Sequence, residues 1–248
     1  MHGPGYFLKG MRLLSRPGIR PFVVAPVLVN LLLFVALTFF MVNRFDAVTD
    51  WMVDQWGEWL NWILWLLWLV VGLVWLALYG YLFATVSYLI AAPFYGLLAE
   101  RVQLHLRGET PEQAFTFKQV ARIAGRSFLR EWRKMRYLIP RLLGVLVLCL
   151  ILTFIPAVNL LVPPLWFAWG AWALAIENID YAADNNQVPF DRLRDQARRN
   201  RFATLGFGGV ALFAASIPLF NLIGIPAAVA GGSALWLDRF REPAAGER

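Results

Sequence analysis

The chain has 248 residues, of which 59% are hydrophobic and 16% are charged. Soluble domains usually hold about 45–50% apolar and about 25% charged residues, so this composition predicts an integral membrane protein with a single membrane domain over residues 1–248. The excess of 23 Lys and Arg over 16 Asp and Glu fits the basic cytoplasmic loops of such proteins, and we expect no nucleic-acid partner.

The residue types needed for most enzyme chemistry are scarce. Cys149 is the single cysteine, so no disulfide can form within the chain. Only His2 and His105 could serve histidine metal clusters or triads, and no phosphate loop or dinucleotide fingerprint occurs. We therefore expect no enzyme activity, no cofactor and no metal site.

The first expected element is a transmembrane helix over residues 22–42. This apolar stretch reaches the length of about 20 residues that crosses the hydrocarbon. A secretory signal has an apolar core of about 7–15 residues and a small-residue cleavage site, and neither feature is present. We expect a retained helix.

The second expected element is an uncharged apolar run over residues 60–99. It allows one very long helix or two spans with a reversal near Gly80. Two crossings would export the Arg-rich residues 100–141, against the bias that keeps basic loops inside. We expect one helix, about 60 Å long and about twice the hydrocarbon thickness, whose second half is covered by protein. Pro93 and Gly96 are expected to kink or break it near its end.

A cytoplasmic basic amphipathic helix is expected over residues 111–139. Its basic residues recur at i, i+4 spacing and form a stripe beside an apolar stripe. The basic stripe comprises Lys118, Arg122, Arg126 and Arg130. Such a helix can lie on anionic lipid headgroups, or it can form a basic vestibule that concentrates a small anion, and the two roles are compatible.

Two helical hairpins are expected over residues 142–176 and 203–237, because the same sequence motif occurs in both. The sequence reads I-P-x-x-N-L-(L/I)-x-x-P at residues 155–164 and again at residues 217–226. Proline lacks a backbone N–H and ends or starts a helix, whereas asparagine suits the turn between two helices.

The apolar arms that precede the two copies of this motif are short. They cover residues 142–155 and 204–217, fewer than the about 20 residues of a full span. Both hairpins are therefore expected to enter the bilayer and return to the same side. Twinned broken helices indicate a transport site, which Asn159 and Asn221 in the two turns would line or gate. The alternative is that the hairpins only anchor the protein in lipid.

An anion-binding turn is expected directly before the first helix, at residues 17–21. Gly18 lets the backbone turn, so that free N–H groups there, including that of Ile19, can converge on an anion at a helix N-terminus. Arg20 or Arg16 would add a planar, permanently charged guanidinium suited to an oxyanion. The alternative is that these basic residues only set the topology.

Charged residues at the ends of apolar segments are the remaining candidates for an ion pathway. Glu100 and Arg101 end the long helix, and Arg130 and Glu131 lie in the basic helix. Such charges can snorkel to the membrane interface, or they can pair inside the protein and mark an ion path. The sequence leaves both alternatives open.

A set of short motifs runs along nearly the whole chain. They are Pro17-Gly18-Ile19-Arg20, Val29-Asn30, I-A-A-P-F-Y-G-L-L-A-E at residues 90–100, Arg130-Glu131-Trp132, Pro140-Arg141, Asp184-Asn185 with Val188-Pro189-Phe190, and Asn221-Leu222. Together they resemble the bacterial sulfate permease CysZ family, most specifically through residues 90–100.

The resemblance implies a multi-pass, homo-oligomeric protein of the bacterial inner membrane that imports sulfate for cysteine synthesis. It also implies an all-α fold with two full transmembrane helices and two hemi-penetrating hairpins. The family binds sulfate at a G-I-R-R motif. Here Gly18, Ile19 and Arg20 keep the first three positions, Pro21 takes the fourth, and Arg16 would compensate. The rival hypothesis is a non-transporting scaffold or membrane-shaping protein anchored by its hairpins.

Overall fold

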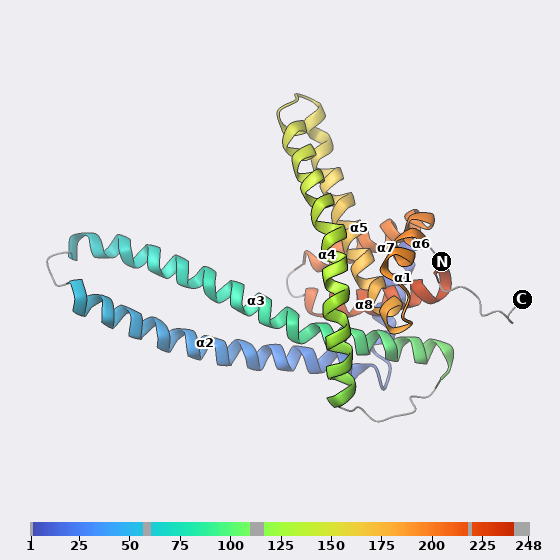
Figure 1. The fold of residues 1–248 in the computed structure, drawn as a ribbon, viewed down its shortest axis with the longest axis horizontal. Coiled ribbons are helices and arrows are strands. Elements are labelled where there is room, and N and C mark those ends of the chain that lie inside the picture. Colours follow the sequence, from blue (N-terminus) through green and yellow to red (C-terminus); the bar gives the residue numbers. More distant parts are fainter. Residues whose placement is uncertain (1, 57–60, 110–116, 218–219, 241–248) are drawn as a thin grey trace, which may run out of the picture. The chain divides into compact units, whose positions relative to one another are not determined.

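The computed structural model of the chain describes residues 2–56, 61–109, 117–217 and 220–240, and it is all-helical over them (Figure 1). The helices are α1 (Gly3–Leu14), α2 (Arg20–Trp56), α3 (Asn61–Arg107), α4 (Phe117–Thr153), the short 3₁₀ helix η2 (Val158–Leu161), α5 (Val162–Asn185), α6 (Phe190–Arg199), α7 (Arg201–Ala215) and α8 (Asn221–Arg239). They form two compact units, one over Val24–Ala92 and the other over Met1–Val23 with Pro93–Arg248.

Four segments of the described residues are long and apolar enough to cross a membrane. They are Arg20–Phe45, Trp68–Ser87, Arg130–Thr153 and Val158–Asn185. The prediction of an all-helical chain with several apolar spans is confirmed.

The unit over Val24–Ala92 is a hairpin of α2 and α3. The Thr38 and Tyr79 hydroxyls lie 2.8 Å apart, and the Trp75 Nε1–H donates to the Met41 carbonyl oxygen at 3.1 Å. Most of the remaining described apolar side chains within this unit are exposed, as expected for a surface that faces lipid. Helix α3 continues through Gly80 without interruption, which is the arrangement expected for a single long helix.

Both long helices extend beyond the residues expected for their membrane-spanning parts. The first helix, expected over residues 22–42, extends to Trp56 because no glycine or proline interrupts the acidic segment before residue 57. The second helix does not break at Pro93 but continues to Arg107. There Gly108, at φ +72°, ends it in a Schellman motif, in which the Glu109 N–H donates to the Leu104 carbonyl oxygen at 2.9 Å.

The core of the other unit is formed by α1, α5, α7 and α8. Helices α7 and α8 pack against both α1 and α5. Glycines allow the backbones to approach closely: Gly10 of α1 lies against the Ala227 carbonyl of α8, and Gly208 of α7 against the Ala171 carbonyl of α5. Small residues at helix crossings are typical of membrane proteins, where packing drives association.

Two helices of this unit were not expected from the sequence. Helix α1 buries Tyr6, Phe7 and Leu14, which recur at helical spacing between its basic residues. Helix α6 begins after Pro189, in a region that is polar in the sequence. Charged residues separate its apolar residues in the sequence, but Phe190, Leu193 and Ala197 lie on one face of the helix and are buried.

The first hairpin consists of α4, η2 and α5, which run side by side and antiparallel beyond the core (Figure 1). The boundary predicted between a basic helix over 111–139 and an arm over 142–155 is wrong, because α4 continues through Pro140. The start of that basic helix, residues 111–116, lies outside the described residues. The candidate membrane spans are longer than the expected arms: Arg130–Thr153 of α4 covers 24 residues, six of them charged, and Val158–Asn185 covers 28.

The second hairpin consists of α7 and α8, close to the bounds expected for residues 203–237. Helix α7 has 15 residues, so its arm is short as predicted. Residues 218–219 of the turn lie outside the described part of the chain. The Gly224 N–H donates to the Phe220 carbonyl oxygen at 2.7 Å as α8 begins.

Candidate functional site

The turn between α1 and α2 contains the predicted anion site. Gly18 has φ +86°, a left-handed conformation that glycine adopts without strain. Ile19 is buried and fixes the turn to the core. Arg16 and Arg20 are exposed, and the Arg20 Nε–H donates to the Ser15 carbonyl oxygen at 2.8 Å. The turn therefore presents two guanidinium groups at the N-terminus of α2.

Two of the backbone amides in this turn are already engaged. The N–H groups of Ile19 and Arg20 donate to the Arg16 carbonyl oxygen at 3.2 and 3.3 Å. In this conformation they point into the turn and away from an external ligand. The positive charge of the site therefore comes mainly from the arginine side chains and the helix dipole.

The structure brings one further predicted residue to this turn. The Arg101 guanidinium of α3 lies over the Phe22 ring, 5.4 Å from its centroid, two residues beyond Arg20. The Arg101 Nε is buried and has no hydrogen-bond partner among the described residues. Glu100 is exposed and forms no hydrogen bond or ion pair with another residue in the described ranges. Arg101 thus joins the turn, whereas Glu100 does not.

A second group of charges is buried between α4 and α5. The Arg130 guanidinium binds the Asp180 carboxylate through Nη2 at 2.6 Å and through Nε at 3.0 Å. Its Nη1 reaches Asp184 Oδ1 at 3.2 Å and the Val188 carbonyl oxygen at 2.8 Å. The side chains of Arg130 and Asp180 are only 12% and 4% exposed. This geometry satisfies the guanidinium through several charge-assisted bonds.

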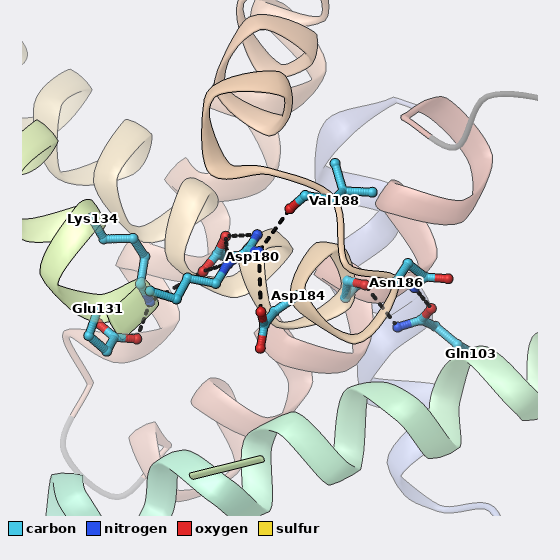
Figure 2. Close-up of polar contacts among 9 residues, drawn as sticks. Gln103, Glu131, Lys134, Asp180, Asp184, Asn186 and Val188 are labelled. Carbon is cyan, nitrogen blue, oxygen red and sulfur yellow. Dashed lines mark hydrogen bonds and ion pairs between the residues drawn. The ribbon is translucent and has the colours of Figure 1, made fainter. Parts of the chain in front are cut away.

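Lys134 completes this group one helical turn after Arg130 (Figure 2). Its Nζ forms an ion pair with Glu131 and lies 3.5 Å from Asp180 Oδ2. Lys134 is 4% exposed, so its charge depends on these carboxylates. We call Arg130, Glu131, Lys134, Asp180 and Asp184 the buried charge cluster.

Amide side chains tie the end of α3 to the end of α5 beside this cluster (Figure 2). The Asn186 Nδ2 donates to Gln103 Oε1 and to the Ala182 carbonyl oxygen, and Arg107 Nη2 donates to Asn186 Oδ1 at 2.9 Å. Asn185 Nδ2 donates to the Gly96 carbonyl oxygen at 2.8 Å. The motif at residues 90–100 and Asp184-Asn185 therefore meet in space.

The predicted turn residues lie away from these charges. Asn159 is exposed in η2 at the tip of the first hairpin, and its N–H donates to the Ile155 carbonyl oxygen at 3.1 Å. Helix α5, which follows η2, rises about 27 Å between Val162 and Asp180 at about 1.5 Å per residue. Asn221 begins α8, and its side chain lies outside the described part of the structure.

The sequence analysis missed Lys134, Asp180 and Asp184. A signal was available, since Arg130 and Lys134 are spaced i, i+4 and the two aspartates are also spaced i, i+4. It was overlooked because the apolar hairpin was expected to end at residue 176. Among the described residues, no three His, Cys, Asp or Glu side chains are placed to hold a metal ion.

Comparison with known proteins gives full-length matches. The family model described as sulfate transporter CysZ/etoposide-induced protein 2.4 matches residues 6–226. The sulfate transporter CysZ of Pseudomonas aeruginosa is 36% identical over 244 residues, which cover 98% of each chain. That of Vibrio cholerae serotype O1 is 38% identical over 241 residues, which cover 96% of this chain and 94% of the relative.

Proposed function

Because the chain belongs to the sulfate transporter CysZ/etoposide-induced protein 2.4 family, we propose that it imports sulfate, or a related oxyanion, across the bacterial inner membrane for cysteine synthesis. The observation that carries this proposal is the full-length similarity to relatives named as sulfate transporters. The four apolar segments support it, because a multi-pass protein can enclose a path for an ion.

The capture site in this proposal is the turn between α1 and α2. Gly18, Ile19 and Arg20 form it, Arg16 adds a second exposed guanidinium, and Arg101 lies beside it at Phe22. A sulfate dianion is costly to move from water into a low dielectric, so it needs positive groups at its point of entry. A positively charged helix N-terminus flanked by arginines meets that need.

The ion pathway in this proposal includes the buried charge cluster. Arg130 is the positive group there, and Asp180, Asp184 and Glu131 offset it, so that an anion passing Arg130 is not held tightly. Glu100, Asn159 and Asn221 remain proposed members of the pathway. Transport of sulfate along this path is driven by an ion gradient or by the gradient of sulfate itself, without ATP.

The proposed membrane arrangement has two full crossings, by α2 and α3, and two hairpins that return to the side they entered. The 15-residue α7 supports a re-entrant second hairpin. In the first hairpin the candidate span Arg130–Thr153 of α4 has 24 residues, about 36 Å of helix and enough to cross the hydrocarbon, whereas its uncharged part follows Arg141 and is shorter than a full span. Labelling at Asn159 tests which arrangement the first hairpin adopts. The exposed apolar faces of these helices support a homo-oligomer.

Sulfate uptake into proteoliposomes tests the function. We expect saturable uptake in the wild type and a loss of about 10-fold or more in Arg20→Ala, since a charge-assisted bond contributes about 1.5–3 kcal/mol. The matched control is Arg12→Ala, which removes an exposed positive charge from α1 and so changes the topology signal equally. Absence of uptake in every protein would favour the scaffold hypothesis, and equal loss in both variants would show that Arg20 acts only on topology.

A further inference from the structure

A pocket of about 390 Å³ lies between α4 and α6, apart from both groups of charges described above. Its lining residues come from one stretch of α4 and from the start of α6. They are Arg133, Arg136, Tyr137, Arg141, Pro189, Phe190, Asp191 and Arg194. We call it the arginine pocket.

The charges of the arginine pocket are not balanced within the protein. Four guanidinium groups face it, against the single carboxylate of Asp191. Arg194 is paired, because its Nη1 lies 3.1 Å from Asp191 Oδ1 and its Nη2 lies 3.1 Å from Asp195 Oδ1. Arg133 and Arg136 are exposed and form no ion pair or hydrogen bond with any other residue of the described ranges. An anion in the pocket would supply the missing counter-charge.

Two of the arginines are held in place by an aromatic ring. The Arg141 guanidinium stacks on Tyr137, 3.8 Å from the ring centroid, and its Nη1 donates to the Tyr137 carbonyl oxygen at 2.9 Å. The Arg194 guanidinium lies 5.8 Å from the same centroid. Tyr137 is itself buried, packs edge-on against Phe190 and accepts a hydrogen bond from Trp172. Stacked guanidiniums keep donors free for a ligand and lose little freedom on binding.

The start of α6 adds to the positive field. The helix begins at Phe190, and its cap residue Pro189 makes no side-chain hydrogen bond to the first amides. The helix dipole favours negative charge at this end, where Asp191 lies in the first turn. The pocket thus combines four guanidiniums with a helix N-terminus.

We propose that the arginine pocket binds a tetrahedral oxyanion group, a phosphate or a sulfate. The group can belong to the headgroup of an anionic phospholipid or to a free oxyanion. Its position favours the lipid, because exposed Leu142, Leu143 and Leu146 follow Arg141 on α4 and mark the start of an apolar segment. The proposal does not rest on sulfate transport or on the turn that precedes α2.

The test uses the full chain in detergent with two kinds of probe. The lipid probe is short-chain phosphatidylglycerol, with phosphatidylcholine as its zwitterionic counterpart; the free probes are inorganic phosphate and sulfate. The pocket variant is Arg133→Gln with Arg136→Gln, because neither side chain holds the fold together. The control is Arg198→Gln with Arg199→Gln, two exposed arginines of α6 outside the pocket. All proteins carry Arg20→Ala, so that the turn before α2 does not contribute.

We expect the pocket variant to bind phosphatidylglycerol at least about 10-fold more weakly than the control, since two charge-assisted bonds are lost. Loss of lipid binding without measurable binding of free phosphate or sulfate identifies a lipid headgroup site. If the pocket variant loses affinity for free phosphate or sulfate as much as it loses affinity for the lipid, the pocket is a free-oxyanion site. Equal affinities in the pocket variant and the control, for every probe, would overturn the proposal.

Discussion

Replacement of Arg130 by methionine should unfold the protein at a markedly lower temperature. The change removes the guanidinium that binds the Asp180 and Asp184 carboxylates, whose side chains are only 4% and 12% exposed. Removing one partner of a buried ion pair costs about 3–5 kcal/mol, because the other charge stays desolvated. For a chain of this size about 1 kcal/mol shifts the melting temperature by about 2–4 °C, so we expect a fall of about 6–20 °C.

The assay heats samples of the purified protein in detergent to a series of temperatures and measures, by size-exclusion chromatography, how much folded protein remains at each one. The matched control is Arg198→Met, which makes the same replacement at an exposed position of α6. Its melting temperature should stay within about 2 °C of the wild type, because exposed charges contribute little. A fall in Arg130→Met no larger than in this control would refute the buried charge cluster.

A double variant separates the structural role of this cluster from its proposed role in transport. Arg130→Met with Asp180→Leu replaces both members of the Arg130–Asp180 ion pair by apolar side chains, and such replacements are often neutral or stabilising. We expect much of the lost stability to return. Sulfate uptake should nevertheless stay low if Arg130 lies on the path, and uptake at the wild-type level would show that the cluster only stabilises the fold.

Three other changes have defined outcomes. Gly10→Ala should lower the melting temperature by several degrees, because its Cβ would collide with the backbone of α8, whereas Gly5→Ala, with open space around it, should not; equal effects would refute this packing. Gly18→Ala forces a positive φ on alanine at about 1–2 kcal/mol and should weaken sulfate uptake relative to Gly72→Ala, a control in open space; equal uptake would argue against the turn as the capture site. A cysteine at Asn159, in a chain without the native cysteine, should react with a membrane-impermeant thiol reagent only from the side of the Arg-rich segments if the first hairpin is re-entrant, and reaction from the opposite side would show a full crossing.

The helices themselves could largely be predicted from composition and breakers. The uncharged run through Gly80 forms one helix, as the positive-inside argument required, because a lone glycine costs a helix only about 1 kcal/mol. Gly108 ends that helix, since a left-handed residue there completes the hydrogen bonds of the last turn. Both results follow from local physics that a single sequence contains.

The ends of α2 and α4 could not be predicted by the same reasoning. The expected transmembrane helix stopped at residue 42, where the uncharged stretch ends, yet the acidic segment that follows contains no glycine or proline before residue 57 and continues the helix. The start of the apolar run at residue 142 suggested a boundary, yet α4 is continuous there and passes through Pro140. Prolines are tolerated inside membrane helices when neighbouring groups satisfy the freed carbonyls. Hydropathy alone reports where a helix is apolar and not where it ends.

The candidate site was predicted only in part, because its partners are distant in sequence. Arg130 and Glu131 were selected as charged residues near apolar segments, and both belong to the buried charge cluster. Asp180 lies fifty residues after Arg130, and only the antiparallel packing of α4 and α5 brings them together. The proximity of Arg101 to Phe22 likewise depends on tertiary structure. Spacing along one helix cannot report such pairs.

The packing of α1 against α8 has a consequence for biosynthesis. The first helix of the chain buries its apolar face partly on the last one, and Gly10 lies against Ala227 and Gly231. A nascent chain therefore cannot complete this core until α8 has left the ribosome, more than two hundred residues after α1. Chains that stop before α8 would expose the Tyr6 and Phe7 side chains, which gives quality-control proteases a means of recognising unfinished molecules.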